Sequence, residues 1–199
     1  MLRSFTPVSL ALLAALLIAA VVTDLRSRRV PNRLVLSGIG LAVATHVVAF
    51  GTGAAALAGP AWWSPLAGLA TGFALLMPLH LLRATGAGDV KLMAMVGAFL
   101  GAPATVSATL YTLLAGGALS LLFMLGRGVA AQTIANVRFM LTDLAQRAQS
   151  GGGMRLAPLQ TTAARLPYAV AIALGTGAAL LWPLWPLGSA AAPLAGLTR

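Results

Sequence analysis

Six apolar runs constrain the fold of this chain more than any other feature. They lie at residues 8–23, 34–50, 66–82, 89–101, 104–125 and 166–187. A transmembrane helix needs about 20 predominantly apolar residues, and most of these runs approach that length. Only 8% of the residues are charged, whereas a soluble domain has about 25%. We therefore expect an all-α polytopic membrane protein with about six transmembrane helices, folded as a single membrane-embedded domain over residues 1–199.

The distribution of basic residues predicts the topology. If the loop after the first apolar run is cytoplasmic, every Lys and Arg except Arg3 and Arg199 lies on the cytoplasmic side or at its edge. The amino terminus is then outside. In a soluble chain a net charge of +10 would suggest nucleic-acid binding. Here the cations cluster at the ends of apolar runs, so we expect contact with anionic membrane lipid and no nucleic-acid partner.

Residues 126–165 form the one long polar excursion. Apolar and charged residues alternate irregularly between residues 126 and 150, a pattern typical of an amphipathic helix on the membrane surface. A flexible Ser-Gly-Gly-Gly sequence follows at residues 150–153. We expect a cytoplasmic, partly amphipathic connecting segment; a platform for substrate or partner stays open as the alternative.

The residue inventory excludes several classes of hydrolase. The chain has no cysteine, and its three acidic residues are all aspartates. Without glutamate it has no His-Glu-x-x-His zinc helix, and without cysteine it has no thiol nucleophile or disulfide. The two histidines, His46 and His80, have no Gly-x-Ser-x-Gly turn to serve, so we expect both to be packing residues, with a place near the aspartates as the alternative for His80. We expect neither metal nor cofactor.

Asp24 and Asp89 are the candidate catalytic residues. Each lies where an apolar run meets basic residues, and an aspartate at such a place is costly unless it has a partner or a function. Two neighbouring carboxyl groups share a proton, so one can activate water while the other protonates a peptide carbonyl. Gly86 and Gly88 would let a substrate backbone approach closely. Two structural alternatives stay open: an ion pair of Asp24 with Arg28, and capping of a helix by Asp89.

Three stretches carry a family resemblance. Asp24 followed by Arg-Arg-Val-Pro-Asn-Arg-Leu at residues 28–34, and Gly-Ala-Gly-Asp-Val-Lys-Leu at residues 86–92, resemble the two signatures of prepilin peptidases, the Gly-x-Gly-Asp class of intramembrane aspartic proteases. The Pro167-Tyr168 pair resembles the start of the family's final helix. The resemblance implies that Asp24 and Asp89 are the catalytic pair. It also marks Gly86, Gly88, Lys91, Pro167 and Tyr168 as substrate-binding or motif-supporting residues.

The resemblance implies a substrate and a location as well. The protein would be an endopeptidase of the bacterial inner membrane that removes the basic leader from type IV prepilins at the cytoplasmic face. Its size is similar to that of the compact branch serving tight-adherence (Flp-type) pili, with the pilus secretion machinery as a possible partner. The bifunctional members carry an amino-terminal region with paired cysteines, so we expect no methyltransferase activity here. Lys91 would contact an acidic substrate residue or, as the preferred alternative, lipid headgroups.

Two other functions remain as alternatives. Asp24 and Asp89 could relay protons or bind a cation in a small transporter or channel subunit. The chain could also be a non-catalytic membrane protein of pilus assembly, in which case both aspartates would be dispensable. Finally, the Gly68/Gly72 and Gly97/Gly101 spacings are of the kind that allows close helix contact. In so glycine-rich a chain we attribute them to chance.

Overall fold

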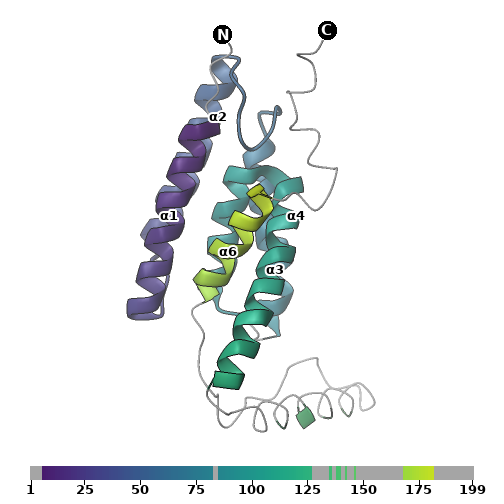
Figure 1. Ribbon diagram of the computed structural model, residues 1–199. Helices are drawn as coiled ribbons and strands as arrows, with labels where there is room; N and C mark the ends of the chain where they lie inside the picture. Colours follow the sequence, from purple (N-terminus) through teal and green to yellow (C-terminus); the bar gives the residue numbers. More distant parts are fainter. Residues whose placement is uncertain are drawn as a thin grey trace.

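The computed structural model describes residues 6–82, 85–126 and 168–181, together with five separate residues between 134 and 147. Within them the chain is all-α, as predicted, and has no strand. The helices, shown in Figure 1, are α1 (Thr6–Ser27), α2 (Asn32–Gly51), α3 (Ser64–Leu81), α4 (Ala87–Gly126) and α6 (Tyr168–Leu181).

Four of these helices, α1 to α4, are long and apolar enough to cross a membrane. The predicted runs 89–101 and 104–125 form the single element α4, which is broken at Gly101. Gly101 has φ 74° and ψ 168°, a backbone conformation that glycine adopts without strain, and Pro103 follows in the next turn. The 14 residues of α6 match only part of the run 166–187, whose remainder lies outside the described residues. Six separate spans therefore stay a prediction, as does the orientation in the membrane.

The amphipathic segment predicted at residues 126–165 lies almost entirely outside the described residues. The exceptions beyond Gly126 are helical and exposed: Ala135, Arg138, Phe139, Thr142 and Gln146. They do not test the predicted role of the segment.

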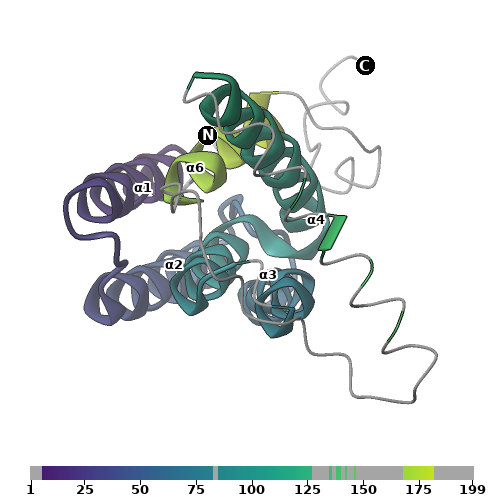
Figure 2. The ribbon, with the colours of Figure 1, turned by 90° about the horizontal axis from the view of Figure 1, so that it is seen from below.

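Helix α4 is the centre of the bundle. It contacts each of the other four described helices. Figure 2 shows the same helices from below. Between Val90 and the break at Gly101 every residue except Lys91 is apolar and buried, as expected for a helix surrounded by others. The buried side chains there include Val90, Leu92, Met93, Met95, Val96 and Phe99. Large apolar side chains on the outside, such as Ile18 and Leu36, are about two-thirds exposed, which suits a lipid-facing surface.

Glycines bring α3 and α4 into backbone contact. A Cβ atom on Gly68 would overlap the carbonyl oxygen of Gly97, and a Cβ atom on Gly97 would overlap that of Gly68. A Cβ atom on Gly72 would likewise collide with the carbonyl of Met93. The attribution of these spacings to chance was therefore wrong. They are contact positions, because only glycine lets the two backbones approach this closely.

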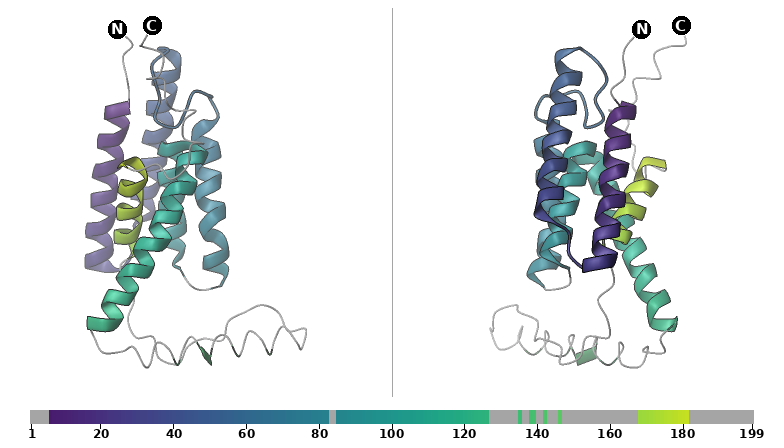
Figure 3. Two further views of the ribbon diagram at one scale, coloured as in Figure 1. Left: turned by 45° about the vertical axis from the view of Figure 1, so that its right-hand side comes forward. Right: turned by 90° about the vertical axis from the view of Figure 1, so that its left-hand side faces the viewer.

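Helix α6 packs against the second half of α4. A Cβ atom on Gly175 would collide with the backbone of Thr112, and one on Gly116 would lie 2.9 Å from the ring of Tyr168. Helix α6 also contacts α1, so it lies between α1 and this half of α4. Figure 3 shows from two sides that α4 continues past the ends of the neighbouring helices. This packing places Tyr168 and the amino-terminal end of α6 beside the last turn of α1.

Candidate active site

Asp24 links α1 to α6. It lies in the last turn of α1, and its side chain is only 8% exposed. Its Oδ2 atom accepts a hydrogen bond of 3.2 Å from the backbone N–H of Ala169, the second residue of α6. The first N–H groups of a helix have no partner within the helix and form its positive end, so a carboxylate is well suited to this position. A residue of the first helix thereby caps the last described one.

The chain turns away directly after Asp24. The N–H of Arg28 donates to the Asp24 carbonyl oxygen over 2.8 Å, and Arg28 has φ 52°, the left-handed conformation that ends many helices. The Ser27 hydroxyl donates to the Thr23 carbonyl oxygen. Within the described residues the Asp24 carboxylate makes no ion pair with Arg28. The ion-pair alternative is therefore wrong.

Asp89 lies in the first turn of α4 and caps that helix. Its Oδ2 atom accepts a hydrogen bond of 2.9 Å from the N–H of Gly86, and the N–H of Asp89 donates to the Gly86 carbonyl oxygen. The predicted alternative that Asp89 caps a helix is therefore confirmed. The cap uses one of the two carboxyl oxygens of Asp89. A Cβ atom at position 86 would lie 3.2 Å from Oδ2, so glycine leaves room for this close approach. In a capping box, the side chain of the third helical residue accepts a hydrogen bond from the N–H of the N-cap residue. Asp89 makes this bond to Gly86.

The structure brings Asp24 and Asp89 together. Asp89 lies within electrostatic range of the Asp24 carboxyl group and of the His80 ring, and Tyr168 lies within electrostatic range of Asp89. The Nδ1 atom of His80 lies 3.0 Å from the Thr85 carbonyl oxygen, which only accepts, so Nδ1–H donates and holds the segment that leads into Gly86. Two carboxyl groups, an imidazole and a phenol thus share one end of the bundle. His80 therefore has the place near the aspartates that was left open.

The two signature sequences also contact each other. Gly88 faces Val30, whose Cβ would lie 3.7 Å from a Cβ atom added at position 88. This is an ordinary contact distance, so packing alone does not require glycine there. Lys91 Nζ donates to Asn32 Oδ1 over 3.1 Å. Lys91 therefore joins α4 to the start of α2, and its predicted contacts with substrate or headgroups stay predictions.

Of the remaining predicted residues, one is described by the structure and one is not. His46 is buried at the far end of α2, and its Nε2 atom lies 2.9 Å from the Ala61 carbonyl oxygen, so it is the packing residue we expected. Pro167 lies outside the described residues. The hydrogen bond from Ala169 to Asp24 was not predicted from the sequence. A proline just before an apolar run is a signal for a helix start, and it could have marked this N-terminus as a place for a carboxylate.

No metal site emerges from the part of the chain that the structure describes. There, no group of three or more histidine and aspartate side chains is placed to hold a metal ion. Independence of metals and cofactors stays a prediction, which the use of chelators would test.

Comparison with known proteins identifies the family of the chain. No curated protein and no solved structure matches the chain. A family model does match: that of the type IV leader peptidase family, over residues 11–121. The match runs from α1 to the second half of α4 and includes both aspartates. The chain belongs to the type IV leader peptidase family and is a membrane peptidase.

Proposed function

We propose that this peptidase is an aspartyl endopeptidase that uses Asp24 and Asp89 as its catalytic pair. The observation that carries the proposal is that α1 and α4 bring these two carboxyl groups within electrostatic range at one end of the bundle. The remaining acidic residue, Asp143, lies outside the described residues. Two carboxyl groups so placed do not both ionise readily, so they share a proton.

The shared proton defines the chemistry. One carboxylate takes a proton from a water molecule as the water oxygen attacks the peptide carbonyl carbon. The other carboxyl group donates its proton to the carbonyl oxygen, and the tetrahedral intermediate then collapses. The C–N bond breaks, and the departing amine takes up a proton from the pair. Hydrogen bonds from Ala169 and Gly86 hold one oxygen of each carboxyl group and so fix the orientation of both.

The proposed substrate is a type IV prepilin of the Flp type. Such a precursor has a short basic leader and one apolar helix that begins just past the bond to be cut. A pair of aspartates at the cytoplasmic ends of the helices would reach that bond without drawing the helix out of the lipid. An acidic residue of the substrate could contact Lys91 of α4 or one of the exposed arginines at the end of α1, in the connection to α2 and at the start of α2, namely Arg26, Arg28, Arg29 and Arg33. The bacterial inner membrane and the pilus secretion machinery complete the proposal.

Co-expression with candidate prepilins tests this function. The wild-type protein should convert the precursor to a form smaller by the length of its leader, as seen on a gel. Asp24→Asn and Asp89→Asn should each abolish the conversion, and the double variant should be no worse than either single one, because the pair acts as a unit. Asp143→Asn is the control and should cleave normally. Cleavage by Asp24→Asn at a rate near wild type would refute the catalytic pair. Absence of cleavage by the wild-type protein would instead favour a transporter or an assembly protein.

A further inference from the structure

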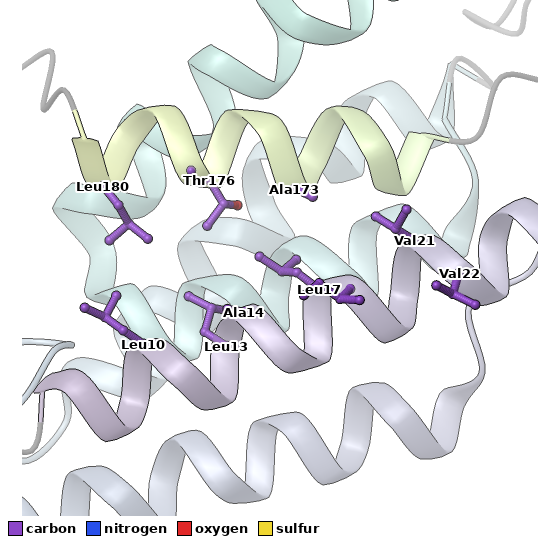
Figure 4. Close-up of a pocket in the computed structure, with 11 residues that line it drawn as sticks. Leu10, Leu13, Ala14, Leu17, Val21, Val22, Ala173, Thr176 and Leu180 are labelled. Carbon is purple, nitrogen blue, oxygen red and sulfur yellow. The ribbon is translucent and has the colours of Figure 1, made fainter.

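An apolar groove lies between α1 and α6. Its volume is about 330 Å³, and Figure 4 shows side chains from both helices lining the space between them. From α1 these are Leu10, Leu13, Ala14, Leu17, Ile18, Val21 and Val22; from α6 they are Ala173, Thr176, Gly177 and Leu180. Thr176 is the one residue among them with a polar side chain.

Both walls of the groove lead to Asp24. On α1, Leu10 and Leu17 are seven residues apart, and Asp24 follows after seven more, so the three share one face of the helix. On α6, Ala169 precedes Ala173 by one turn, and it is the N–H of Ala169 that binds Asp24. The groove therefore ends where the two helices are joined at the candidate catalytic residue.

We propose that this groove binds the apolar helix of the substrate. The inference rests on the proposed function and extends it, because it states the path that the precursor takes from the aspartates into the membrane. Its α1 wall from Leu10 to Val22 is about 18 Å long at 1.5 Å per residue, which matches about three turns of a bound helix. Small residues on both walls, Ala14, Ala173 and Gly177, let another helix approach closely.

Thr176 favours a peptide over a lipid chain as the occupant. Its side chain is fully buried, and its hydroxyl has no hydrogen-bond partner within the described residues. An unpaired hydroxyl in an apolar setting is costly. A polypeptide offers carbonyl, N–H or side-chain partners, whereas an acyl chain offers none. Binding of the precursor would therefore give the Thr176 hydroxyl a hydrogen-bond partner, which an acyl chain cannot do.

The first test fills the groove. Gly177 lines the groove, and a Cβ atom added to it would meet nothing within 4 Å, so this position has room for the start of a larger side chain. Gly117 is an equally open glycine on α4 that does not line the groove. With the precursor in the same proteoliposomes, Gly177→Leu should raise KM by about tenfold or more and leave kcat nearly unchanged. Gly117→Leu should behave as wild type. Equal KM values for the two variants would overturn the proposal.

The second test maps contact and does not depend on turnover. The chain has no native cysteine, so single cysteines report cleanly. Ala14 and Ala15 are adjacent and exposed, but only Ala14 lines the groove. In the inactive Asp89→Asn background, Ala14→Cys should form a disulfide with a cysteine in the apolar helix of the precursor, and Ala15→Cys should not. Equal cross-linking, or none, would leave lipid as the occupant. A disulfide-linked dimer of Ala14→Cys without precursor would indicate a second copy instead, and either result overturns the proposal.

These outcomes differ from a failure of the proposed function. If the wild-type protein cleaves no prepilin, the proposed function fails. If the wild type cleaves but the groove and control variants behave alike, only the groove proposal fails.

Discussion

Replacement of Asp24 by asparagine and by alanine separates the two tasks that the structure gives this residue. Asparagine keeps an oxygen that accepts the Ala169 N–H, whereas alanine leaves that buried donor without a partner. Both variants lose the ability to share and move a proton. We therefore expect both to be inactive, while only Asp24→Ala loosens α6.

The size of the difference follows from the buried hydrogen bond. Removing a helix cap costs about 1 kcal/mol, and a buried N–H left unpaired costs about 1–3 kcal/mol, so we expect a loss of about 2 kcal/mol for Asp24→Ala. For a domain of this size each kcal/mol lowers Tm by about 2–4 °C, which gives about 4–8 °C. Asp24→Asn loses only the attraction between charge and helix dipole, less than about 1 kcal/mol.

Thermal unfolding in detergent, followed by circular dichroism, measures the stability difference, and precursor cleavage measures the chemistry on the same preparations. If Asp24→Asn unfolds at as low a temperature as Asp24→Ala, Asp24 does not stabilise α6 through its hydrogen bond to Ala169. If Asp24→Asn still cleaves, Asp24 is not catalytic. The two measurements are independent, so each tests one role of Asp24.

Three further predictions address packing, topology and cofactors. Gly97→Ala should lower Tm by several degrees because its Cβ would overlap the Gly68 carbonyl, whereas Gly117→Ala, in open space, should leave Tm unchanged or raise it. In intact cells an impermeant thiol reagent should label Ala55→Cys but not Ser27→Cys, both exposed sites; labelling of Ser27→Cys would reverse the proposed orientation. Purified enzyme should cleave in the presence of chelators and transfer no methyl group from S-adenosylmethionine; inhibition by a chelator would point to a metal site instead.

Local sequence was enough to predict the helices. Apolar runs marked α1, α2 and α3 to within about four residues, since the need to satisfy backbone hydrogen bonds in lipid leaves helices as the solution for such runs. The boundary between the predicted runs 89–101 and 104–125 coincides with the break in α4 at Gly101, whose observed φ glycine adopts readily. The resemblance of two short signatures to a known family was equally readable, and the family match agrees with it.

Contacts between helices could not be predicted from the sequence. A helix that is apolar on every side gives no periodic signal of which face meets which neighbour. The glycines of α3 and α4 were therefore dismissed as chance spacings, although they allow a close backbone contact between those helices. For the same reason the groove between α1 and α6 could not be anticipated.

The sequence by itself determined the type of element, the position of the two aspartates and the family. The helix cap formed by Asp89 is local and was among the alternatives drawn from the sequence. Only the tertiary structure decided what Asp24 contacts. Asp24 binds a backbone N–H 145 residues further along the chain, and no local pattern specifies such a partner. The position of this partner depends on the packing of α6, which approaches α4 so closely that a Cβ atom on Gly175 would collide with Thr112. Close packing of small residues, rather than polarity along the chain, decides the geometry of this site.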